Sequence, residues 1–168
     1  GHEDHIGALP YVLPQLNVPV YGTRLTLGMV EKKLKEFTML TNVDLRVVKA
    51  KEIHKIGDFD VEFIKTNHSI ADSVAIAIHT SVGTIIHTGD FKIDYHPIDG
   101  EIMDLHRFAE LGKQGVLLLL SDSTNVERPG YTMSESTVGT TFIDIFRSAR
   151  QRIIVATFAS HVHRIQQV

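Results

Sequence analysis

The chain opens with Gly1-His2-Glu3-Asp4-His5-Ile6-Gly7, a stretch that places two histidines and two carboxylates within four positions. Imidazole nitrogens and carboxylate oxygens are ligands that Zn²⁺ and similar divalent ions accept. On a loop or at the edge of a helix, such a run can serve two adjacent ions, an arrangement that clamps a phosphoryl group for attack by hydroxide. The alternative is that Asp4 only caps a helix beginning near Ile6 and that the histidines are solvated. The stretch alone leaves both interpretations open.

The composition limits the classes of protein and of metal site that are possible. Hydrophobic residues make up 43% and charged residues 22% of the 168 positions, as in ordinary globular proteins, and the longest apolar run, Val116 to Leu120, is too short to span a membrane. The formal charge of −3 argues against a simple basic surface for nucleic acids. Because the chain has no cysteine, any metal must be bound by histidine, aspartate and glutamate, and a cytoplasmic location is expected.

Apolar periodicity predicts a mixed α/β fold. Strands dominate the first part of the chain, and Ser81-Val82-Gly83 between two β-rich runs predicts a hairpin. Strands and helices then alternate, and the architecture changes near residues 125–133. The runs 116–120 and 152–158 show no alternation of apolar and polar residues, so both are predicted to be strands buried on both faces. Helices are predicted over residues 23–37, 102–111 and 132–150, and from residue 160 or 161 onward.

Three further stretches carry polar, ligand-type residues at the point where a predicted strand ends. They are Thr66-Asn67-His68-Ser69, Thr88-Gly89-Asp90 and Ser121-Asp122-Ser123-Thr124. Because strand ends on a common sheet edge can converge on one site, we expect these side chains to lie close together. Each stretch also has an ordinary structural interpretation, as a surface histidine, a common turn or an Asx-turn.

Taken in order, these stretches resemble a known family. The opening run, His68 and Thr88-Gly89-Asp90 resemble the successive metal motifs of the metallo-β-lactamase fold, and Asp122-Ser123-Thr124-Asn125 resembles the first motif of the β-CASP nuclease branch. The whole chain is similar to the bacterial ribonuclease J family. The resemblance implies an α/β architecture, with a partial metallo-β-lactamase αββα sandwich over residues 1–130 and the start of an α/β β-CASP domain over residues 131–168.

The resemblance also implies a site for two zinc ions. One zinc ion would be bound by His2 and His68. The second would be bound by Asp4 and His5, and Asp90 would bridge the two. Mn²⁺ in place of Zn²⁺ stays open, because a site of nitrogen and oxygen ligands suits both metals.

Asp4, Asp90 and Asp122 are the predicted catalytic residues. Besides binding metal, Asp4 is the candidate for orienting the attacking hydroxide, while Asp122 would support the metal-binding histidines from outside the ligand shell. A contact to RNA phosphate is predicted for residues that open a helix after a predicted strand, where backbone N–H groups favour anions. These residues are His161, His163 and Arg164. The alternative is a solvated start of that helix.

The predicted function is that of a zinc-dependent ribonuclease that hydrolyses RNA phosphodiester bonds. The resemblance implies 5′-to-3′ exonuclease action with endonuclease capability, in ribosomal RNA maturation and messenger RNA decay. It also implies RNA as the partner, no membrane association, and assembly into a homodimer or homotetramer.

The chain looks like a piece of a longer protein and is predicted to be inactive alone, because one expected ligand would lie directly before Gly1. Two alternatives stay open: a non-catalytic RNA-binding or assembly subunit of the same fold, and a small-molecule metallo-hydrolase.

Overall fold

A computed structural model describes residues 1–37 and 43–168, which form the mixed α/β fold that the sequence predicts. The helices are α1 (Glu3–Ile6), α2 (Leu9–Val12), α3 (Arg24–Lys35), α4 (Leu105–Gln114), α5 (Ser136–Ser148) and α6 (Val162–Gln167). The strands are β1 (Val20–Gly22), β2 (Leu45–Val47), β3 (Ile53–Ile56), β4 (Phe59–Lys65), β5 (Val74–Thr80), β6 (Gly83–His87) and β7 (Val116–Leu120). None of the helices in these ranges has the length and apolar composition needed to cross a membrane.

The strands form two sheets. Strands β1 and β2 pair in parallel, and the larger sheet has the order β3-β4-β5-β6-β7. Its first four strands are antiparallel neighbours, while β6 and β7 are parallel and are joined through α4. The predicted hairpin is confirmed: β5 and β6 pair around the turn at residues 81–82.

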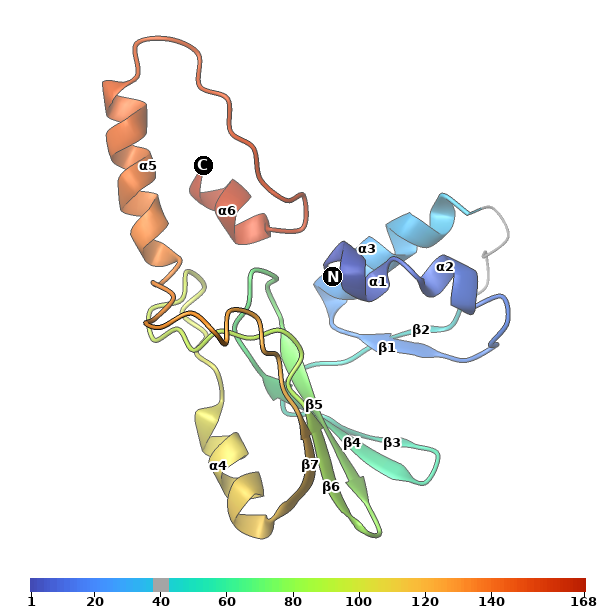
Figure 1. The fold of residues 1–168 in the computed structure, drawn as a ribbon. Helices are drawn as coiled ribbons and strands as arrows, with labels where there is room; N and C mark the ends of the chain where they lie inside the picture. Colours follow the sequence, from blue (N-terminus) through green and yellow to red (C-terminus); the bar gives the residue numbers. More distant parts are fainter. Residues whose placement is uncertain (38–42) are drawn as a thin grey trace.

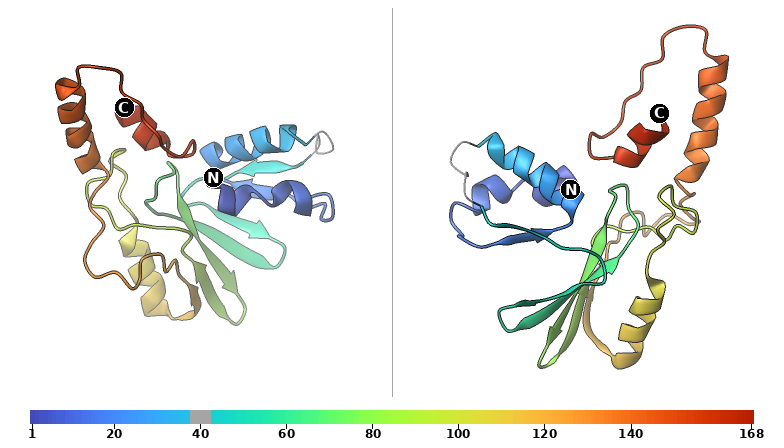
Figure 2. Two further views of the ribbon diagram at one scale, coloured as in Figure 1. Left: turned by 45° about the horizontal axis from the view of Figure 1, so that its top comes forward. Right: turned by 180° about the vertical axis from the view of Figure 1, so that it is seen from behind.

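Alternation along the strands divides the apolar core between layers. On β4, Val61 and Phe63 face β1 and β2, whereas Ile64 points to the opposite side of the sheet and packs with Leu111 of α4. A third cluster, which includes Val30, packs α1, α2 and α3 against β1 and β2. Figures 1 and 2 show the resulting order of helices, small sheet, large sheet and α4. The predicted αββα layering is therefore confirmed.

The last part of the chain lies beyond one end of these layers. Figures 1 and 2 show α5 projecting away from the sheets, with α6 turned back toward the N-terminal segment. Several polar contacts tie this part to the layers. Lys92 Nζ donates to the carbonyl oxygen of Met133 at 3.0 Å, and Ser134 Oγ donates to Asp94 Oδ2 at 3.0 Å. The boundary between two domains near residue 130 stays a prediction.

Two predictions about buried strands are wrong. Strand β7 exists, but among the described residues it pairs only with β6, and its leucines are exposed, Leu117 by 60%. Residues 152–158 form no strand, and Ile154 is 88% exposed. An unbroken apolar run shows that a segment has no polar face, but it does not show which partner covers it.

Helix α4 begins and ends differently from the prediction. The side chain of Asp104 accepts a hydrogen bond from Arg107 N at 3.0 Å and caps the first turn, so the helix begins three residues later than predicted. It then continues beyond residue 111, where it was predicted to end, and its last residue is Gln114, with Gly115 at the C-cap position. The positive φ of 98° at Gly115 favours glycine at this position.

A buried charge cluster fixes α4 against the large sheet. Glu62 of β4 is only 5% exposed and accepts hydrogen bonds from Arg107 of α4, Nε to Oε1 at 2.7 Å and Nη2 to Oε2 at 3.0 Å. His79 Nε2 lies 2.9 Å from the same Oε2. The hydrogen bonds from Arg107 are the main reason why the pKa of Glu62 is lowered, with a smaller contribution from His79.

This lowered pKa makes the fold sensitive to acid. A carboxylate with a folded-state pKa below its unfolded value contributes stability above the unfolded pKa of about 4.5 and loses it as the pH falls through the folded pKa. We therefore expect the free energy of unfolding to fall less steeply below about pH 5 in Glu62→Gln than in the wild type. Chemical denaturation between pH 3 and pH 7 measures this, and identical slopes for the two proteins would contradict it.

Candidate metal centre

The opening segment forms one helical turn, α1, with His2 at the N-cap position. The backbone of His2 is extended, with φ −70° and ψ 153°, and no side chain makes a capping hydrogen bond there. Asp4 lies inside the turn, and its side chain is 77% exposed. The alternative interpretation of Asp4 as a helix cap is therefore wrong, and its carboxylate stays available for other partners.

Asp4, His5 and Asp90 form a close cluster of ligand-type atoms. One ligand atom from each of the three side chains lies within 4.8 Å of the other two. His5 Nε2 is 3.1 Å from Asp90 Oδ2 and 3.6 Å from Asp4 Oδ2. Two carboxylates thus face one imidazole, a grouping that a divalent cation stabilises.

His68 and His2 extend this cluster. His68 Nε2 is 3.7 Å from Asp90 Oδ2, and the rings of His2 and His68 are 5.0 Å apart and nearly perpendicular. Both nitrogens of His2 also have hydroxyl partners at 2.5 Å, Ser160 Oγ at Nδ1 and Ser69 Oγ at Nε2. The structure thus brings together the five side chains that were predicted to bind metal, although their role as ligands stays a prediction.

The two serines were missed as contributors to the site. Ser69 follows His68 directly, so its proximity is a local effect. Ser160 lies 158 positions from His2 in the chain. Its signal in the sequence is its place two residues after the run 152–158, where a predicted strand gives way to a predicted helix.

Asp122 contacts the loop that carries Asp90 rather than the cluster itself. Its Oδ2 accepts a hydrogen bond from Phe91 N at 3.4 Å, and its own N–H donates to Thr88 Oγ1 at 3.0 Å. Thr88 N in turn donates to the carbonyl oxygen of Leu120, which continues the pairing of β6 with β7. Asp122 therefore fixes the loop between Thr88 and Phe91, and Asp90 is part of this loop.

Burial and hydrogen bonding set the charge state of these groups. Burial lowers the pKa of both His2 and His68, which favours the neutral imidazole that binds a metal. Burial alone would raise the pKa of Asp122, but hydrogen bonds from Thr124 and Phe91 outweigh it, so the pKa of this carboxyl is lowered.

The donor set fits a pair of divalent ions. Three imidazoles and two carboxylates converge, and two of the imidazoles are held neutral by burial. Nitrogen and oxygen ligands of this kind suit Zn²⁺ and Mn²⁺ alike. Asp90 lies near both His5 and His68, as a ligand shared between two ions would.

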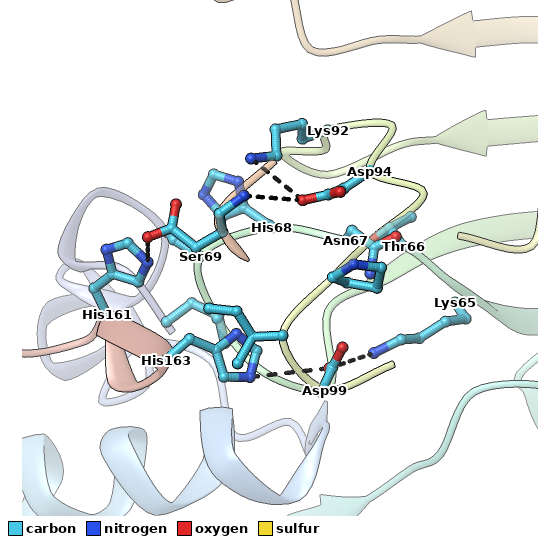
Figure 3. A pocket seen from close by; sticks show the side chains of 14 residues that line it. Lys65, Thr66, Asn67, His68, Ser69, Lys92, Asp94, Asp99, His161 and His163 are labelled. Carbon is cyan, nitrogen blue, oxygen red and sulfur yellow. Dashed lines mark hydrogen bonds and ion pairs between the residues drawn. The ribbon is translucent and has the colours of Figure 1, made fainter. Parts of the chain in front are cut away.

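The residues predicted to contact RNA phosphate lie in different surroundings. Arg164 donates from Nε to Glu135 Oε1 at 2.6 Å and lies over the ring of Phe142, so its charge is already paired. His161 and His163 line a separate cavity, shown in Figure 3. Their contact with RNA stays a prediction.

Comparisons with known proteins identify the chain's relatives. The chain is 51% identical to ribonuclease J of Synechocystis over 98% of its length, 45% identical to that of Thermus thermophilus over 100%, and 45% identical to ribonuclease J2 of Bacillus subtilis over 100%. Over its whole length, the chain matches a segment of ribonuclease J. No family model matches the chain. The chain spans 26% of the Synechocystis ribonuclease J and 30% of the other two proteins.

A solved structure supports the fold of this chain. A protein of unknown function from Enterococcus faecalis superposes with a TM-score of 0.67 over 89% of this chain and 38% of that protein. The sequence identity is 17%, so this likeness concerns the fold alone.

Proposed function

We propose that this chain is part of a metal-dependent ribonuclease that hydrolyses phosphodiester bonds in RNA. The convergence of Asp4, His5 and Asp90 beside His2 and His68 is the observation that carries the proposal. The similarity to ribonuclease J over the whole chain supports RNA as the substrate.

The roles of the residues follow from their positions. When bound, a pair of divalent ions generates hydroxide from water near neutral pH and neutralises the phosphate oxygens. His2 and His68 supply neutral imidazoles, and Asp90 lies where it can contact both halves of the cluster. Asp4, the most exposed carboxylate of the cluster, is placed to accept a proton from the attacking water or to orient it. Asp122 holds the loop that carries Asp90.

A cleft of about 920 Å³ beside the cluster offers room for a nucleotide. Lys32 and Lys33 of α3 line it; Lys33 is paired with Glu3, and Lys32 adds positive charge for the RNA backbone. Phe158 also lines the cleft, is 78% exposed, and presents a ring on which a base can stack.

The finer assignments rest on the family resemblance. They are zinc as the metal in preference to manganese, 5′-to-3′ exonuclease action with endonuclease capability, and roles in ribosomal RNA maturation and messenger RNA decay. Assembly as a homodimer or homotetramer and a cytoplasmic location also belong to this proposal.

Metal removal tests the proposed function directly. In a full-length protein that carries this segment, we expect about two equivalents of Zn²⁺ or Mn²⁺ per chain, loss of RNA cleavage after chelation, and recovery when the metal is returned. End-labelled RNA and elemental analysis measure these outcomes. A protein that binds RNA but holds no metal and cleaves nothing would favour the non-catalytic subunit instead, and hydrolysis of lactams or thioesters without RNA cleavage would favour the small-molecule hydrolase.

A further inference from the structure

A second cavity, of about 200 Å³, lies next to the metal cluster. His68 and Ser69 line both this cavity and the cleft that contains the cluster, so the two spaces adjoin. Figure 3 shows its lining, which comes from the connection between β4 and β5, from the loop that follows Asp90, from Glu135 before α5, and from the start of α6. The proposed reaction assigns no task to this cavity.

Polar atoms without partners gather in this cavity. Among the residues that the structure describes, four buried side-chain atoms have no hydrogen-bond partner, and three of them belong to lining residues: Thr66 Oγ1, Asn67 Oδ1 and His161 Nε2. His161 Nε2 lies 3.5 Å from Glu135 Oε1 and so has an ion-pair partner, which leaves Thr66 Oγ1 and Asn67 Oδ1. Thr66 is 1% exposed and Asn67 7%. A buried polar atom without a partner costs free energy, so two of them on adjacent residues at one cavity indicate a ligand that supplies the missing hydrogen bonds.

The charged groups of the cavity already have partners. Lys92 Nζ lies 3.6 Å from Asp94 Oδ2, and Asp99 Oδ2 lies 3.9 Å from both Lys65 Nζ and His163 Nε2. The hydrogen-bonding capacity that is left belongs to neutral groups, and the carboxylates in the lining repel a phosphate. A neutral ligand group that both donates and accepts hydrogen bonds fits best, as a hydroxyl does.

We infer that this cavity binds the ribose hydroxyls of a nucleotide whose phosphate lies at the metal cluster, and thereby selects RNA over DNA. A ribose 2′-hydroxyl can donate to Asn67 Oδ1 while it accepts from Thr66 Oγ1. The 2′-hydroxyl is the group that distinguishes RNA from DNA at a given site. This inference rests on the proposed function, because the ligand is the RNA substrate of that site.

The test compares Thr66→Val with wild type in a full-length protein that carries this segment. Valine has the same shape and removes only an unpaired hydroxyl, so the variant should fold as well as the wild type. We expect the wild type to prefer RNA over DNA of the same sequence, in kcat/KM and in equilibrium binding. In Thr66→Val this preference should decrease about 10-fold, as for the loss of one hydrogen bond to the substrate. The decrease should come from weaker binding and slower cleavage of RNA, while the values for DNA stay unchanged.

Two further variants make the test specific. Thr66→Ser keeps the hydroxyl and should retain the preference, whereas Thr141→Val changes an exposed threonine of α5 and should leave it unchanged. Unchanged preference in Thr66→Val, or equal losses on RNA and DNA, would overturn the inference, while metal-dependent cleavage of RNA by the wild type would uphold the proposed function. A wild type without metal and without RNA cleavage would overturn both.

Discussion

Asp90→Ala is expected to lower kcat/KM for RNA at least about 1,000-fold in the full-length protein, because metal-ion stabilisation of the transition state amounts to several kcal/mol. Asp90 Oδ2 lies 3.1 Å from His5 Nε2 and 3.7 Å from His68 Nε2, so its removal takes away the one carboxylate near both histidines. Asp4→Ala is expected to cause a loss of the same kind. Cleavage of end-labelled RNA and metal analysis of each variant provide the measurement.

His54→Ala is the matched control for these variants. His54 is a half-buried histidine of β3 that contacts Glu52 and packs against the rings of Tyr21 and Phe63. It is not among the ligand-type residues of the cluster, so its loss should leave cleavage by the folded protein unchanged. Wild-type rates for both Asp4→Ala and Asp90→Ala would show that the cluster is not the reaction centre. A thousandfold loss in His54→Ala would place that centre elsewhere.

Arg107→Met is expected to lower the free energy of unfolding by about 3 kcal/mol, as is typical when one partner of a buried ion pair is removed. Arg107 makes two hydrogen bonds to Glu62, which is 5% exposed, and methionine retains apolar length without the charge. Among the residues that the structure describes, only His79 would then remain within hydrogen-bonding distance of the Glu62 carboxylate. Chemical denaturation at neutral pH measures the change.

The control for Arg107→Met is Lys55→Met. Lys55 pairs with Asp60 at 3.3 Å, but both side chains are more than half exposed, so the expected change is below about 0.5 kcal/mol. If the two variants destabilise the protein equally, the buried position of Glu62 does not determine the strength of its ion pair.

The sequence was informative where a local rule applied. The turn at residues 81–83 predicted the β5–β6 hairpin, because short loops between β-rich runs join neighbouring strands. Polar residues at three strand ends predicted a common location, and His68 and Asp90 do lie together. The prediction that strand ends lie close together depends only on whether the strands exist, so small errors in the predicted strand bounds do not change it.

The sequence was not informative where long-range contacts decide the outcome. The exposure of Leu117 depends on which strand lies beside β7, and the apolar run itself carries no information about this. The contact of Ser160 with His2 spans 158 positions and follows from the path of the chain after α5. The cavity beside His68 is formed by four separate segments, so no single motif predicts its unpaired polar atoms.

The assembly of the site from distant segments also affects how variants are compared. His5 and Asp90 are 85 positions apart and meet only when the large sheet is complete. A change far from the reaction centre, such as one between β4 and α4, therefore reduces the fraction of molecules in which the site exists at all. Rates should be normalised to the folded population before any residue of this chain is assigned a chemical role.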